Sequence, residues 1–128
     1  MGGWIEVDYA GTVGLFPFMK VNPGEVLIVL VTVPSQVEAR KISKFVVEEK
    51  FAACANVIPG IRSMYRWKGK VEVAQELLLI LKTTRKKYAA LEKAVKKLHP
   101  YEVPEIIGFR AGVGLPQYLG WVRHEIHH

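Results

Sequence analysis

Apolar and polar residues follow two different periods along this chain, and each change of period marks a new expected element. Residues 26–33 are uncharged and rich in β-branched side chains, which is typical of a strand buried on both faces. Ser35 follows, with Glu38 three positions later, a capping box that predicts a helix ending near Lys50. Apolar side chains then recur at helical spacing, at Ala39, Ile42, Phe45 and Val46.

A long strand with an interruption is expected after this helix. Residues 51–58 are mostly apolar, and Pro59-Gly60 follows them. Because residues 61–67 alternate again, the interruption predicts a bulge or bend and not the end of the strand. Lys68-Gly69 then predicts a tight hairpin turn, since glycine adopts positive φ freely.

The returning strand, residues 71–81, changes character along its length. Its outer half is mixed, whereas residues 77–81 are wholly apolar. The base of the hairpin is therefore expected in the core, while its tip projects beyond the domain. A projecting tip exposes Tyr65 and Trp67 to water unless a partner covers them.

A second helix is expected to begin at Thr83 or Thr84 and to run to about Leu98, where Pro100 ends it. The last expected elements are a short strand at residues 105–110 and a short helix at residues 117–126.

The expected order is strand, helix, strand, strand, helix, strand, with a terminal helix. This is the α+β, ferredoxin-like (βαββαβ) arrangement, with both helices on one face of an antiparallel sheet. Residues 25–128 would form this domain. Residues 1–24 are glycine-rich and form an N-terminal extension, or else contribute an extra edge strand from part of residues 4–9.

Composition narrows the class of protein. With 128 residues, half of them apolar, the chain is one domain able to bury a core. Its single cysteine, Cys54, excludes an internal disulfide and fits a reducing compartment. No apolar run is long enough to span a bilayer, and Glu6 and Asp8 stand where a secretory signal carries positive charge. We therefore expect a cytoplasmic protein with no membrane partner.

The formal net charge of +6 raises the question of nucleic-acid binding. Much of the excess lies in residues 85–97, where lysines fall on the outer faces of the second expected helix. No aromatic platform accompanies them, so a solvated helix face is favoured over a nucleic-acid surface. Motifs of nucleophilic catalysis, phosphate loops and dinucleotide binding are also missing from the sequence.

Four ordered segments resemble the CutA divalent-cation-tolerance family. They are EEKFAACANVIPGIRSMYRWKGKVE, ELLLILKTT, KLHPYEVPEII and YLGWV. The resemblance covers about residues 25–126. It implies a fold similar to the PII signalling proteins, a tight homotrimer whose long hairpins reach across neighbouring subunits, and an association with divalent metals, above all copper. It implies no catalytic reaction, so the chain is not expected to be an enzyme.

Two places in the chain are candidates for a metal site for Cu(II) or another divalent cation. His99 is followed by Glu102 and Glu105, so its imidazole and their carboxylates could bind one metal ion together. The alternative, equally favoured, is that the ring helps to end the helix by bonding a free carbonyl. Cys54 is a soft ligand without a second ligand at metal-binding spacing, so a buried structural thiol is the alternative. The family sometimes carries a cysteine near the position of Val31, and its absence here weakens a site built on two thiols per subunit.

A second group of residues points to a ligand pocket or an interface between subunits. It comprises Tyr65, Trp67, Lys68, Glu72, Lys82 and Tyr101. The hairpin residues would form half of a pocket closed by a neighbouring subunit, or an interface alone. Lys82 would contact an anion near a helix N-terminus. The sequence therefore predicts a metal-associated homotrimer, with a PII-like sensor of small anionic metabolites or a purely structural scaffold trimer as alternatives.

Overall fold

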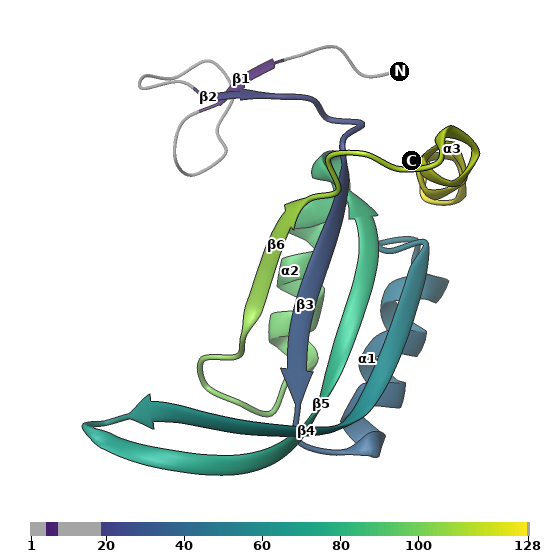
Figure 1. Ribbon diagram of the computed structural model, residues 1–128. Helices are drawn as coiled ribbons and strands as arrows, with labels where there is room; N and C mark the ends of the chain where they lie inside the picture. Colours follow the sequence, from purple (N-terminus) through teal and green to yellow (C-terminus); the bar gives the residue numbers. More distant parts are fainter. Residues whose placement is uncertain (1–4, 8–18, 128) are drawn as a thin grey trace.

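The computed structural model describes residues 5–7 and 19–127, and Figure 1 shows their arrangement. Its main sheet has four antiparallel strands in the order β4-β5-β3-β6. The strands are β3 (Val26–Val33), β4 (Cys54–Trp67), β5 (Lys70–Thr84) and β6 (Ile106–Arg110). This order, with one helix in each crossover, is the ferredoxin-like arrangement, and the predicted α+β fold class is confirmed.

Helices α1 (Gln36–Glu48) and α2 (Arg85–Leu98) pack side by side on one face of the sheet (Figure 1). The Ser35 hydroxyl caps α1 by accepting from the Glu38 N–H at 3.4 Å, as predicted. Thr84 occupies the N-cap position of α2 but makes no side-chain cap bond. The Thr83 hydroxyl instead donates to the Phe51 carbonyl at 2.6 Å. The segment leading into β4 is thereby fixed to the end of β5.

The core lies between these helices and the sheet. Its fully buried side chains alternate along β3 and β5 and recur at helical spacing on α1 and α2. They include Val29, Val31, Val33, Ile42, Val46, Leu79, Leu81, Leu91 and Val95.

The end of α1 has the hydrogen bonds of a Schellman motif. The Phe51 N–H donates to the Val46 carbonyl at 2.9 Å, and the Lys50 N–H donates to the Val47 carbonyl at 3.1 Å. The motif requires a left-handed residue between helix and strand, and Lys50 adopts it with φ of 63°. This position usually holds glycine, so the lysine carries a local conformational cost.

The hairpin of β4 and β5 has the two irregularities that the sequence predicts. The register shifts between Ile58 and Ile61, which confirms the bulge, and Gly60 there has φ of 79°. At the tip, Lys68 and Gly69 both have positive φ, at 51° and 79°, as a type I′ turn requires. The outer hairpin bends away from the sheet and projects from the domain (Figure 1).

The prediction that β3 is buried on both faces is wrong for a single chain. Its residues alternate between buried and half-buried, because helices cover only one side of the sheet. On the other side, α3 (Pro116–Glu125) covers only one end, where Val122 and Ile126 pack against Val26. Arg123 of this helix donates from Nε to the Gly24 carbonyl at 2.6 Å.

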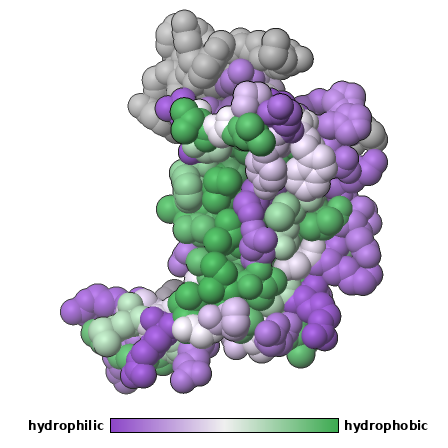
Figure 2. All heavy atoms as spheres, turned by 45° about the vertical axis from the view of Figure 1, so that its right-hand side comes forward, coloured by the Kyte–Doolittle hydropathy of each residue, from purple (hydrophilic) through white to green (hydrophobic). Residues whose placement is uncertain are grey.

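The rest of that side, here called the open face, is largely apolar. Figure 2 shows hydrophobic side chains gathered over the sheet. By strand register, the apolar members of the open face are Ile28, Leu30, Ile58, Leu78, Ile80, Ile107 and Phe109. Ile58, Ile107 and Phe109 are 41 %, 56 % and 51 % exposed.

A separate two-stranded sheet precedes the domain. Strand β1 (Ile5–Val7) pairs antiparallel with β2 (Met19–Val21). Residues 4–9 therefore contribute a strand, but it pairs within residues 1–24 and not at an edge of the main sheet. Residues 4, 8 and 9 lie outside the described residues. The division of the chain at residue 25 stays a prediction.

Candidate binding site between the hairpin and the segment after α2

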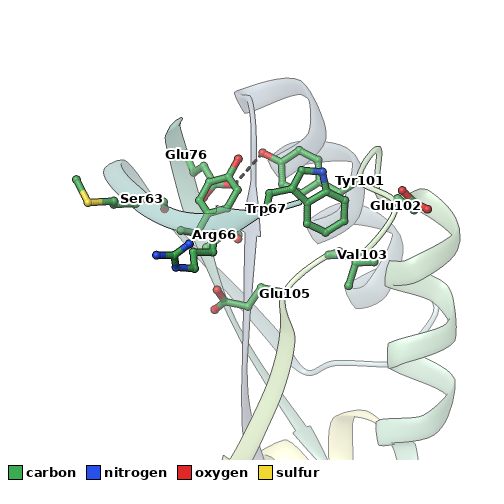
Figure 3. A pocket seen from close by; sticks show the side chains of 12 residues that line it. Ser63, Arg66, Trp67, Glu76, Tyr101, Glu102, Val103 and Glu105 are labelled. Atoms are coloured by element: carbon green, nitrogen blue, oxygen red, sulfur yellow. Dashed lines mark hydrogen bonds between the residues drawn. The ribbon is translucent and has the colours of Figure 1, made fainter. Parts of the chain in front are cut away.

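A cavity of about 760 Å³ lies where the hairpin bends past the segment that joins α2 to β6. Figure 3 shows side chains from both segments converging on it. Its lining comprises Thr32 of β3, Ser63, Met64, Tyr65, Arg66, Trp67 and Glu76 of the hairpin, and Tyr101, Glu102, Val103, Pro104 and Glu105 of the segment after α2.

A buried carboxylate is the central feature of this cavity. Glu76 is only 6 % exposed, and its Oε2 accepts a 2.8 Å hydrogen bond from the Tyr101 hydroxyl. Burial, and then the hydrogen bond to Glu76, raises the pKa of Tyr101 well above its ordinary value. The neutral phenol therefore stays available as a donor to this carboxylate.

His99 holds the segment after α2 against β3. The ring is 7 % exposed, its Nε2 lies 2.7 Å from the Thr32 carbonyl, and its Nδ1 accepts from the Tyr101 N–H at 3.1 Å. A carbonyl only accepts, so the hydrogen of the neutral ring belongs on Nε2. With both nitrogens engaged, the ring would have to break one of these bonds before it could bind a metal.

The predicted carboxylate ligands line the same cavity as Tyr101 but do not converge with His99. Figure 3 shows Glu102 and Glu105 directed to separate places, with Arg66 on the side of Glu105. Within residues 5–7 and 19–127, no three histidine, cysteine or acidic side chains stand close enough to hold a metal ion. The metal roles of His99, Glu102 and Glu105 stay predictions.

Cys54 lies in a different place, on the open face near α3. It pairs in register with Lys82, whose Nζ donates to the Asn56 side chain and lies 3.8 Å from the Cys54 sulfur. Burial, with a smaller effect of Cys54, raises the pKa of Tyr118 nearby on α3. The structure thus places Cys54 and Lys82 together, away from the cavity. Their roles toward a metal or an anion also stay predictions.

The hairpin residues divide between the cavity and the tip. Tyr65 and Trp67 line the cavity and remain 43 % and 40 % exposed. Lys68 extends over the Trp67 ring, with its Nζ 5.8 Å from the centroid, and Glu72 lies opposite Tyr65 in the hairpin register. Lys68 and Glu72 are not among the cavity residues.

Glu76 was not predicted from the sequence as a site residue. The signal in the sequence that could have indicated Glu76 is its position directly before the apolar run 77–81. In a strand, this position places the carboxylate at the border of the core, on the face opposite Leu77. Its hydrogen-bond partner Tyr101 lies far along the chain, and no local pattern joins the two.

Comparisons with known proteins agree with the fold and the motifs. The family model "CutA1 divalent ion tolerance protein" matches residues 27–125. The "Divalent-cation tolerance protein CutA" of Thermus thermophilus is 51 % identical over 96 residues, which cover 75 % of this chain and 93 % of that protein. "Protein CutA" of mouse is 44 % identical over 104 residues, covering 81 % of this chain and 58 % of the longer mouse protein.

Solved structures of CutA proteins resemble this chain in fold as well. The crystal structure of CutA from Xylella fastidiosa superposes with a TM-score of 0.78 at 41 % identity, covering 80 % of this chain and 98 % of that one. These matches extend over most of the chain and include both the hairpin and the segment that holds His99. The chain therefore belongs to the CutA1 divalent ion tolerance family, whose description names ion tolerance and no catalytic reaction.

Proposed function

We propose that this protein acts as a cytoplasmic homotrimer in tolerance to divalent cations, and that it works by binding and not by catalysis. The observation that carries this proposal is the open face. A soluble single chain rarely leaves so much of a sheet apolar and uncovered, and such a face favours association with further subunits.

The projecting hairpin supports the association of several copies, as the proposed trimer requires. Its tip extends beyond the sheet with Tyr65 and Trp67 partly exposed, so it has the length and the aromatic surface to contact a neighbour. The edge strands β4 and β6 each have one side whose backbone N–H and C=O groups do not pair within the sheet, and these groups can pair with a neighbouring subunit. A closed ring of copies would cover these surfaces without leaving an open end.

Cu(II) or another divalent ion is the proposed partner. No group of three metal-binding side chains occurs in the described part of one chain. The proposed metal site therefore takes ligands from more than one subunit, with His99, Cys54, Glu102 and Glu105 as the candidates.

The charges that line the cavity do not favour an anionic metabolite as its ligand. Three glutamates and one arginine line it, so a further anion would meet repulsion there. Lys82 is held on the open face by Asn56 and Cys54 and does not line this cavity.

Native mass spectrometry tests the proposal. The protein is prepared without His127 and His128, which would bind metal adventitiously, stripped of metal and titrated with Cu(II) and with Zn(II). A trimer that takes up a whole number of ions per subunit, and loses them in Cys54→Ala or Glu105→Gln, would support it. A trimer that stays empty would contradict the metal role and leave a scaffold trimer.

A further inference from the structure

A second cavity, of about 310 Å³ and here called the helix groove, lies between α1 and α2 on the helix-covered side of the sheet. One of its walls is aromatic. The rings of Phe45 on α1 and of Phe51 directly after that helix contact each other, with their centroids 6.0 Å apart. Phe45 belongs to the apolar stripe of α1 and yet remains 40 % exposed. The groove therefore offers apolar surface that this chain does not cover.

The opposite wall belongs to α2 and combines small apolar residues with two cations. Ala90 and Ala94 lie one turn apart, and their short side chains leave the space between the helices open. Leu98 continues this wall, which extends for about 12 Å along the helix axis. Lys93 and Lys97, also one turn apart, line the same groove.

The charge at the helix groove is positive only. Its lining includes Lys93 and Lys97 and no acidic side chain. Neither ammonium group belongs to an ion pair found among the described residues. The whole of α2 carries six basic side chains and one acidic side chain, so the potential around the groove attracts anions. A lysine can lay its methylene groups along an apolar wall while its ammonium group stays in water at the rim.

We propose that the helix groove binds a medium-chain alkyl carboxylate, whose chain lies against Phe45 and Ala94 and whose carboxylate pairs with Lys93 and Lys97. The apolar walls bury the chain, and the two ammonium groups supply the donors and the opposite charge for the head group. The volume is near the lower limit of small-molecule sites, so it fits one alkyl chain better than the row of side chains by which a protein helix docks.

The assembly proposed above leaves the helix groove accessible. That assembly covers the open face and the hairpin. The residues that line the groove come from α1, from α2 and from the segment directly after α1, on the other side of the sheet. The ligand needs no neighbouring subunit and no metal ion, so this inference goes beyond the proposed function and does not depend on it.

Isothermal titration of the full chain with heptanoate at low salt tests the inference, beside two probes that each change one feature. Heptanoate is expected to bind with a dissociation constant on the order of 1 mM. Heptanol keeps the chain but lacks the charge, and it should bind roughly fivefold more weakly or worse. Butyrate keeps the charge but has a shorter chain, and it should bind at least roughly tenfold more weakly.

A pair of lysine variants identifies the head-group site. The double variant Lys93→Gln/Lys97→Gln should weaken heptanoate binding roughly fivefold or more. Lys86→Gln/Lys96→Gln is the matched control, because it removes the same charge from two exposed lysines of α2 that do not line the groove. It should weaken binding by no more than about a factor of two, since charges at a distance are screened.

A pair of alanine variants identifies the chain site. Ala90 and Ala89 are both exposed on α2, but only Ala90 lines the groove. Ala90→Trp should fill the groove and abolish detectable heptanoate binding, whereas Ala89→Trp should leave binding unchanged. All four altered lysines and both alanines are exposed, so these variants should keep the fold.

Three results would overturn the inference. The first is no binding of heptanoate up to about 10 mM. The second is equal binding of heptanoate and heptanol, or of heptanoate and butyrate. The third is an equal loss of binding in the two lysine double variants, which would show a diffuse attraction by the net charge. None of these results bears on the mass of the assembly or on its metal uptake, so the proposed function is judged separately.

Discussion

The hydroxyl of Tyr101 donates a 2.8 Å hydrogen bond to the buried carboxylate of Glu76, joining the segment after α2 to the base of the hairpin. Replacing Tyr101 by Phe removes this donor and leaves the carboxylate buried with no partner among the described residues. We expect the free energy of unfolding to fall by about 1.5–3 kcal/mol, measured by urea denaturation at fixed protein concentration.

Tyr88 provides the matched control for that variant. Its hydroxyl donates at 2.9 Å to Glu92, whose carboxylate is exposed on α2 and stays solvated without it, so Tyr88→Phe should cost about 1 kcal/mol or less. Equal losses in the two phenylalanine variants would show that burial of Glu76 adds nothing to the bond.

The same tyrosines predict a loss of stability at alkaline pH. Burial, followed by the effect of Glu92, raises the pKa of Tyr88 from 10.0 to about 12, and burial with Glu76 raises the pKa of Tyr101 further. Above pH 10 the unfolded chain loses these protons while the folded protein keeps them, so stability falls as pH rises through the folded pKa values.

Denaturation midpoints between about pH 9 and about pH 11 measure this effect. The wild type should keep its stability up to about pH 10 and lose it above that pH, and Tyr101→Phe should lose less. A decline as steep in the Tyr101→Phe protein as in the wild type would assign the alkaline sensitivity to other groups.

His99 is expected to contribute to folding whether or not it binds metal. Its ring bonds both the Thr32 carbonyl and the Tyr101 N–H, and His99→Ala leaves these backbone groups without their partner. We predict a loss of about 1–3 kcal/mol in the metal-free protein, measured by thermal or urea unfolding. His124→Ala, an exposed change on α3, is the control and should have little effect. An unchanged stability in metal-free His99→Ala would contradict the structural role and favour that of a ligand.

Lys50 offers a stabilising substitution. It has φ of 63° at the position of the Schellman motif where glycine is usual, so Lys50→Gly should relieve the left-handed strain. After the entropy cost of glycine, the expected gain is about 0.5–1 kcal/mol. Glu49→Gly, one residue earlier and at negative φ, should destabilise instead. A loss of stability in Lys50→Gly would mean that the lysine side chain makes a compensating contact.

The parts of the fold that the sequence predicts well depend on local signals. Pro59-Gly60 indicated the bulge, Lys68-Gly69 the turn, and Ser35 with Glu38 the start of α1, because each acts through its own backbone geometry. The pairing of Glu76 with Tyr101 depends on tertiary folding across 25 positions, and no periodicity reveals it.

The open face shows a second feature that cannot be predicted from the sequence. The apolar run of β3 correctly predicts a strand, but a residue covered by a helix and one covered by another subunit look the same in the pattern. Ile28 and Val29 are equally apolar, yet only Val29 is fully buried in the single chain.

Sedimentation equilibrium of the wild type beside a variant of the open face, Phe109→Asp, tests the proposed assembly most directly. Val37→Asp is the matched control, because Val37 is apolar and 67 % exposed but lies on α1, away from the open face. The proposal predicts a wild type and a control at three times the chain mass of 14.4 kDa, with Phe109→Asp shifted toward the monomer. A wild type that sediments as a monomer would contradict the proposed assembly and the shared metal site that depends on it.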